Sequence, residues 1–195
     1  MNVLLFILLT LPVLWSKTVL VMGDSLTEGY HLAKEEAYPF LLEADLRKTH
    51  PDLKIINGGI SGSTTASAMK RLDWYLKARP EIMLLALGAN DGLRGMKVEE
   101  TRKNLEKVIR KARDRGITVV LGGMKLPPNY GKAYTDSFNA IFPALAREHK
   151  LLFIPFILEG VAGNPKLNLP DGIHPNPEGH KVIARTVKKF LEPLL

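Results

Sequence analysis

A serine, a histidine and an aspartate occupy positions in this sequence from which they could together hydrolyse an ester. Ser25 follows the apolar run at residues 18–22 after a two-residue turn, and Asp171 stands three residues before His174. A serine hydroxyl is a weak nucleophile until a base removes its proton, and a carboxylate that accepts the imidazole Nδ1–H orients the histidine as that base. The residue types predict Ser25 as nucleophile, His174 as general base and Asp171 as orienting acid. The alternative for Ser25 is a turn serine that caps the following helix.

Ester hydrolysis also needs hydrogen-bond donors for the oxyanion that forms on the attacked carbonyl. Three groups are candidates: the backbone N–H of Ser25, the backbone N–H of Gly62 in a glycine-containing loop, and the side-chain amide of Asn90. Loss of one such donor typically lowers kcat by about 10²–10³. The alternative for Asn90 is an ordinary turn residue.

The remaining polar residues near these loops carry simpler predictions. We expect Asp24 and Asp91 to accept backbone N–H bonds within their own loops. A metal site built from Asp24, Asp91 and His174 is conceivable, but no ligand pair has the local spacing of a known site, so we expect no metal and no other cofactor. We expect His180, inside the last helix, to be a partly exposed surface residue.

Five short apolar runs alternate with helical patterns along the chain. The predicted strands are at residues 18–22, 53–57, 81–87, 117–121 and 151–154, and the predicted helices are at about 35–49, 64–77, 98–115, 134–150 with a break at Pro143, and from Pro177 onward with Asn176 as N-cap. The alternation predicts an α/β fold: a three-layer α/β/α sandwich around a five-stranded, parallel, doubly wound sheet with the flavodoxin-like order 2-1-3-4-5. The loops at 23–25, 57–63 and 88–91 would then share one edge of the sheet.

Length and composition indicate one ordinary globular domain. The chain has 195 residues, a formal net charge of +7 and no cysteine, which excludes disulfides, thiolate catalysis and cysteine-ligated zinc. The basic residues are spread among acidic neighbours, which favours a generally basic, solvated surface and no nucleic-acid partner. The alternative is a weak attraction to anionic membranes or to acidic substrates. We expect residues 17–195 to form the domain and to be monomeric, with an oligomer as the alternative.

The first sixteen residues predict a targeting segment. Residues 3–15 form an apolar run that is too short to span a bilayer and has the length of a secretory h-region, which predicts a signal peptide and export to the periplasm or medium. No Lys or Arg precedes the run, and the large Leu14 lies where a small residue is expected near a cleavage site. The alternatives are an uncleaved membrane anchor, a start codon assigned too late, and a cytoplasmic protein.

Four motifs in order resemble the blocks of the SGNH (GDSL) hydrolase family. They are Gly-Asp-Ser-Leu at residues 23–26, Asn-Gly-Gly-Ile-Ser-Gly ending at Gly62, Gly-Ala-Asn-Asp at residues 88–91 and Asp-Gly-Ile-His at residues 171–174. The resemblance runs from about Lys17 to the C-terminus and is to the bacterial branch of thioesterases, lysophospholipases and arylesterases. It implies Ser25 as nucleophile, Gly62 and Asn90 in the oxyanion hole, the acid and base in the last motif, and export to the periplasm.

Together these features predict a serine esterase that works through an acyl-enzyme on carboxylic esters and thioesters, of lysophospholipase, arylesterase or acyl-CoA thioesterase type. Apolar residues near the polar loops are candidates for a groove that binds the acyl chain of a small ester or lysophospholipid. These are Leu26, Leu93, Met124, Leu126, Pro127 and Tyr130. The alternatives are a carbohydrate acetyl esterase and a non-catalytic lipid- or glycan-binding protein on the same fold.

Overall fold

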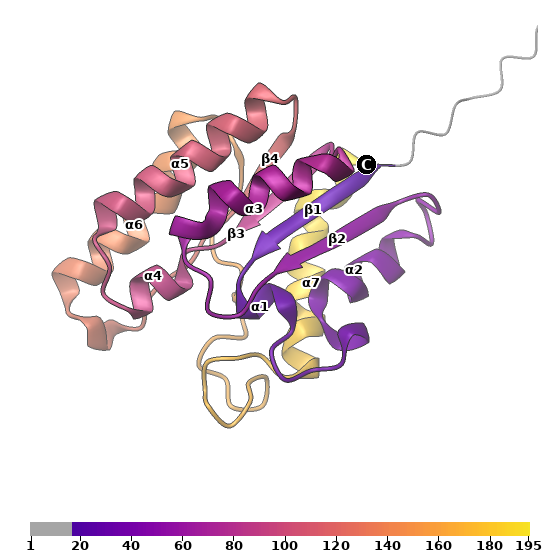
Figure 1. Cartoon of the computed structure of the whole chain (residues 1–195). Helices are drawn as coiled ribbons and strands as arrows, with labels where there is room; N and C mark the ends of the chain where they lie inside the picture. Colours follow the sequence, from indigo (N-terminus) through magenta and orange to yellow (C-terminus); the bar gives the residue numbers. More distant parts are fainter. Residues whose placement is uncertain (1–16) are drawn as a thin grey trace, which may run out of the picture.

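The computed structural model describes residues 17–195, so the predicted signal peptide, residues 1–16, lies outside the described residues. Five strands form one sheet: β1 (Thr18–Gly23), β2 (Lys54–Gly59), β3 (Ile82–Ala86), β4 (Thr118–Gly122) and β5 (Leu152–Ile154). Their order is β2-β1-β3-β4-β5, and each neighbouring pair is parallel. Figure 1 labels the strands β1 to β4 of this sheet. The predicted α/β class and strand order are confirmed. Within residues 17–195, no helix is both long enough and apolar enough to cross a bilayer.

Helices cover both faces of the sheet. On one face lie α2 (Tyr38–Leu46) and α7 (Pro177–Leu191); on the other lie α3 (Ala68–Tyr75), α5 (Val98–Asp114) and α6 (Lys132–Glu148) (Figure 1). The central strands β1 and β3 are buried along almost their whole length, which explains why both read as continuous apolar runs. Asn176 caps α7 as predicted, its side-chain oxygen accepting the Gly179 N–H at 3.0 Å.

Two local predictions are wrong. The helix expected to break at Pro143 is continuous: α6 runs through it from Lys132 to Glu148. A proline inside a helix loses one backbone hydrogen bond, but Phe138 and Phe142 are buried on the same helix and pack edge to face, with ring centroids 5.6 Å apart. We infer that burial of this face outweighs the lost bond. The second difference is at residues 88–91, where the polar loop begins a short helix, α4 (Ala89–Leu93).

The sheet order opens a crevice where β1 and β3 end. From β1 the chain crosses to β2 on one side, and then returns to β3 on the other side, so the loops after β1 and β3 diverge. Ligands of open parallel sheets bind at such a switch point, outside the carboxyl ends of the strands. Gly23 and Ala86 are register partners at these ends. Ser25 and Asn90 follow them and are thereby brought to one place.

The turn after β1 is tight and is held by a side chain from α3. A Cβ on Gly23 would lie 2.0 Å from Thr27 Oγ1, so the turn needs glycine at this position. The Arg71 guanidinium donates hydrogen bonds to the Gly23 carbonyl at 2.7 Å and to the Gly58 carbonyl. This arginine therefore ties together the carboxyl ends of β1 and β2 beside the serine.

Candidate active site

A continuous series of hydrogen bonds joins the three residues expected to do the chemistry. Ser25 is the first residue of the short helix α1 (Ser25–Glu28) and is 9% exposed. Its Oγ lies 3.0 Å from His174 Nε2, and His174 Nδ1 lies 2.7 Å from Asp171 Oδ2. With Nδ1–H donated to the carboxylate, Nε2 is left as an acceptor for the serine hydroxyl. The geometry is that of nucleophile, general base and orienting acid.

The loop before α7 holds the Asp171 carboxylate in its ionised form. Partial burial works to raise the pKa of Asp171, but the His174 N–H, the His174 ring and the Ile173 N–H together lower it to about 2. Both backbone donors lie 2.9 Å from Oδ1, which leaves Oδ2 for the imidazole. The carboxylate is therefore charged throughout the neutral range and can stabilise an imidazolium.

Two of the three predicted oxyanion donors line one cavity with the serine hydroxyl. The Ser25 N–H is at the first position of a helix, where no intrahelical acceptor exists. Asn90 on α4 donates one side-chain N–H to the Ser63 carbonyl at 3.1 Å, and an amide has a second N–H to offer. Gly62 has a left-handed φ of +73° and its carbonyl accepts from Arg94, but it lies outside the residues that line the cavity.

Asp91 joins three elements of the fold, which differs from the prediction that it holds only its own loop. Its buried carboxylate accepts from the Thr65 N–H at 2.9 Å and from Thr65 Oγ1 at 2.5 Å, and Thr101 Oγ1 on α5 lies 3.4 Å away. Asp91 therefore fixes α4, and with it Asn90, against the segment that follows the Gly62 loop. Thr65 lies 26 residues before Asp91 and Thr101 lies 10 residues after it. The sequence pattern of the Asp91 loop therefore gave no sign of these contacts.

Asp24 accepts a backbone N–H of its own turn, as expected, and in doing so it caps α1; it is also a buried carboxyl group. Its Oδ1 accepts the Leu26 N–H at 3.1 Å, whereas Oδ2 is buried without a hydrogen-bond partner among the described residues. Burial raises the pKa of Asp24 to about 6, although the Leu26 N–H and the Arg71 charge oppose this increase. The residue beside the nucleophile is thus partly protonated in mildly acidic solution.

His180 is a core residue, so the prediction of a partly exposed surface histidine is wrong. It is 1% exposed, and its Nδ1 accepts the Tyr38 N–H at 3.0 Å, which links α7 to α2. The Tyr38 hydroxyl lies 2.8 Å from Thr27 Oγ1 on α1. Burial, helped by the nearby His174, lowers the pKa of His180 to about 4, so it is neutral at physiological pH. The helical pattern placed it on α7 but could not show that α2 covers it.

A mainly apolar cavity of about 560 Å³ opens from Ser25, Asn90 and His174. Five of the six residues predicted to bind an acyl chain line it: Leu26, Leu93, Met124, Leu126 and Pro127. Tyr130 lies outside this lining. The segment between β5 and α7 contributes further wall residues that sequence reasoning missed: Phe156, Leu158 and Ala162. Their positions depend on how that long connection folds back over the sheet edge, and no periodic pattern marks it.

A second missed residue contacts the catalytic histidine candidate directly. The ring of Tyr30, just after α1, lies 4.4 Å from the His174 ring, centroid to centroid. The two rings are tilted by 35° to each other, so Tyr30 packs beside the imidazole. The sequence placed Tyr30 in the loop after Ser25 but gave no sign that His174 packs on it.

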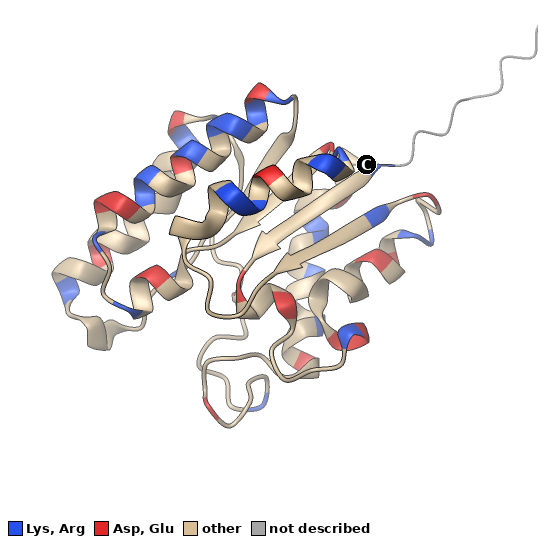
Figure 2. Cartoon of the chain, viewed as in Figure 1, with Lys and Arg blue, Asp and Glu red and all other residues tan. Residues whose placement is uncertain are grey.

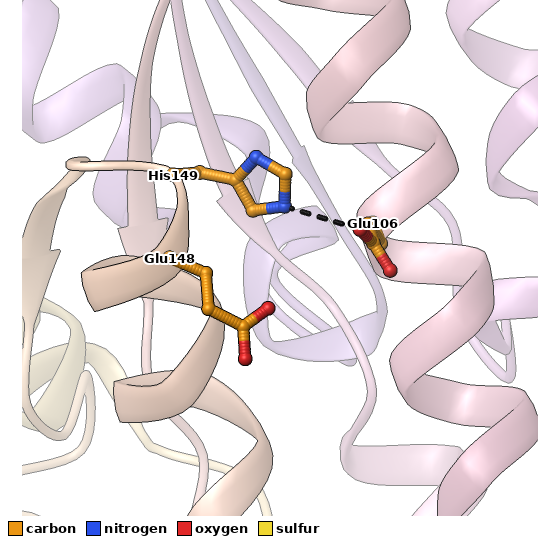
Figure 3. Close-up of side chains that lie close together, drawn as sticks. All are labelled: Glu106, Glu148 and His149. Carbon is orange, nitrogen blue, oxygen red and sulfur yellow. Dashed lines mark ion pairs between the residues drawn. The ribbon is translucent and has the colours of Figure 1, made fainter.

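One group of side chains has the composition of a metal site, but its charges are already balanced. Glu106, Glu148 and His149 bring their ligand atoms within 4.8 Å of one another, with His149 Nε2 3.4 Å from Glu106 (Figure 3). Arg102 forms ion pairs with both glutamates, and Arg110 forms a second ion pair with Glu106 at 2.7 Å. We assign the group as an ion-pair network that joins α5 to α6.

The chain is similar to known hydrolases in sequence and in fold. Residues 21–182 match the family described as GDSL-like Lipase/Acylhydrolase. An arylesterase of Vibrio mimicus is 40% identical over 192 residues, 98% of this chain and 96% of that protein. Thioesterase 1/protease 1/lysophospholipase L1 of Escherichia coli (strain K12) is 36% identical over 193 residues, 98% and 91% of the two chains. The crystal structure of TesA matches with a TM-score of 0.87 and 37% identity, over 92% of this chain and all of that one. This chain therefore belongs to the GDSL-like lipase/acylhydrolase family, and is an ester hydrolase of the SGNH type.

Proposed function

We propose that this hydrolase cleaves esters and thioesters of a single acyl chain through an acyl-enzyme on Ser25. The observation that carries the proposal is the hydrogen-bonded series Ser25–His174–Asp171, which opens onto an apolar cavity. Acyl transfer requires a nucleophile that is hydrogen-bonded to a general base, and a base that is oriented by an acid. The apolar wall of the cavity gives an acyl chain a place to bind.

The first half of the proposed reaction forms the acyl-enzyme. Ser25 Oγ attacks the substrate carbonyl while His174 Nε2 takes the hydroxyl proton, and the imidazolium is stabilised by the Asp171 carboxylate. The oxyanion accepts from the Ser25 N–H and the Asn90 amide. The resemblance of the motif that ends at Gly62 to the second family block supports the Gly62 N–H as a third donor, although Gly62 lies outside the residues that line the cavity. The intermediate collapses when His174 gives its proton to the leaving alcohol or thiol, which departs and leaves the acyl group on Ser25.

Water completes the cycle by the same groups. His174 takes a proton from water, the resulting hydroxide attacks the acyl carbonyl, and the second intermediate forms at the same donors. His174 then protonates Ser25 Oγ, and the carboxylic acid is released.

The cavity favours substrates with more than an acetyl group. Each methylene moved from water into apolar surroundings gains about 0.8 kcal/mol, so kcat/KM should rise with chain length until the cavity of about 560 Å³ is filled. We propose single-chain acyl esters, including lysophospholipids and aryl esters, as the substrate class, in line with the names of the relatives. Chains too short to reach the walls would be poorer substrates.

A chain-length profile with p-nitrophenyl esters from acetyl to palmitoyl, together with labelling by an organophosphate, tests the proposal. We expect hydrolysis to be fastest with esters of medium or long acyl chains, and we expect the organophosphate to label Ser25. Both the hydrolysis and the labelling should be lost in Ser25→Ala. Turnover of the acetyl ester alone would favour a carbohydrate acetyl esterase, and no turnover would favour a binding protein. A label on another residue would remove Ser25 from the mechanism.

We also propose that residues 17–195 form one hydrolase domain released from an N-terminal export signal. The support is the apolar run before residue 17 and a family match that spans residues 21–182. N-terminal sequencing of the protein recovered from the periplasm or medium should begin near Lys17. An intact first segment in the membrane fraction would favour the anchor instead.

A further inference from the structure

An exposed aromatic patch lies on α3, away from the residues of the proposed mechanism. The Trp74 side chain is 66% exposed and Ile60, in the loop after β2, is 46% exposed. With Lys70, Tyr75 and Lys77 they border a surface hollow of about 520 Å³, and we call these five residues the Trp74 patch. We propose that the Trp74 patch docks the protein on the surface of an anionic phospholipid membrane.

The charge of the patch is the first support for this partner. Lys77 Nζ lies 4.2 Å from the centre of the Trp74 ring, and Lys70 forms no ion pair with another described residue. The acidic residue of the hollow, Asp73, is paired with Lys111 from α5. Figure 2 shows the basic residues of α3 and of the turn after it on either side of this one acidic position. The patch is therefore cationic, on a chain whose formal net charge is +7.

The side-chain types are the second support. An indole ring with an apolar body and one N–H donor is suited to the boundary between lipid headgroups and acyl chains. Lysines beside it can extend their stems along the apolar surface and place their ammonium groups among phosphates. A sugar-binding aromatic platform would need free carboxylates or amides for the sugar hydroxyls. Among the described residues that border the hollow, Asp73 is the one side chain of this kind, and it is already paired with Lys111.

The Trp74 patch lies close in sequence to residues that hold the active-site loops. Ile60 lies two residues before Gly62 and three before Ser63, whose carbonyl holds the Asn90 amide. Arg71, on the same helix as Trp74, holds the Gly23 carbonyl beside the nucleophile. Docking through the patch would bring this side of the hydrolase to a lipid surface. The docking itself does not depend on the proposed substrate.

The test measures insertion of Trp74 itself. The full chain has two tryptophans, so a Trp15→Phe background leaves Trp74 as the only indole. The probes are vesicles of phosphatidylcholine alone or mixed with phosphatidylglycerol, each carrying brominated acyl chains that quench tryptophan on contact. We expect Trp74 emission to shift to shorter wavelength and to be quenched in the anionic vesicles only. Lys70→Glu/Lys77→Glu should weaken the apparent affinity by about tenfold or more, since each lysine near an anionic surface contributes several-fold.

A matched control separates the patch from the overall charge. Lys103→Glu/Lys107→Glu makes the same change in net charge at two exposed lysines of α5, and should cost much less affinity. Equal losses in both variants, or quenching that is the same without phosphatidylglycerol, would overturn the proposal. So would co-sedimentation without quenching, because another segment would then bind. Hydrolysis of a soluble p-nitrophenyl ester should be unchanged in Lys70→Glu/Lys77→Glu. If neither the natural protein nor any variant hydrolysed the ester, that result would count against the proposed function and not against the docking.

Discussion

Asp24 offers a direct test of the electrostatics beside the nucleophile. The side chain is fully buried, and only one of its two carboxylate oxygens has a hydrogen-bond partner among the described residues. The substitution Asp24→Asn keeps an oxygen to cap α1 through the Leu26 N–H and removes the charge. We expect this variant to be more stable than the natural protein at neutral and alkaline pH.

The magnitude and sign follow from the pKa. Burial raises the pKa of Asp24 from 3.8 to about 6 in the folded protein. Below about pH 4 the carboxyl is protonated in both the folded and the unfolded chain, and burial of its charge costs nothing. Above about pH 6 it is ionised in both, and a pKa difference of about two corresponds to about 3 kcal/mol lost from the free energy of unfolding. The advantage of Asp24→Asn should therefore grow by about 3 kcal/mol between these limits.

Urea unfolding of both proteins at several pH values between about 4 and 8 measures this difference. The comparison is between the two proteins at each pH, so groups common to both cancel. Asp24→Ala is the control, because it removes the cap as well and should cost about 1 kcal/mol at every pH relative to Asp24→Asn. A stability difference between Asp24→Asn and the natural protein that does not change with pH would refute the reasoning.

Three further predictions concern the oxyanion site, the core and the cavity. Asn90→Ala should lower kcat by about 10²–10³ with little change in KM, and a loss confined to KM would assign Asn90 to substrate binding. His180→Asn retains an acceptor for the Tyr38 N–H but does not titrate. Because the pKa of His180 is lowered to about 4, acidification from about pH 7 to pH 4 should lower the free energy of unfolding of the natural protein by up to about 3 kcal/mol more than that of the variant. Urea unfolding measures both free energies, and the same pH dependence in the two proteins would contradict this. Met124→Trp fills part of the cavity and should shift the optimum in the p-nitrophenyl ester profile to shorter chains; an unchanged profile would place the acyl chain elsewhere.

The sequence by itself determined the sheet and the place where its loops meet. Runs such as Ile82–Ala86 are apolar throughout because a parallel strand is covered on both faces, and helices between them force crossover connections. Once five strands were assigned in the order 2-1-3-4-5, the residues after β1 and β3 had to converge at one edge. The short spacing between Asp171 and His174 likewise indicated that the two would form a pair, and they do.

Only the tertiary structure decided the contacts between residues far apart in the chain. Ser25 and His174 are separated by 149 positions, and the distance of 3.0 Å between them depends on how the connection from β5 to α7 folds back. The same holds for Asp91 and His180, whose local patterns indicated a turn and a helix surface while their partners lie on other elements. Periodicity and capping report on neighbours within a few residues, whereas burial and charge depend on which element packs on top. That is why the sequence placed the chemistry at the end of β1, and the fold supplied the buried Asp24 charge, the cavity walls and the exposed Trp74.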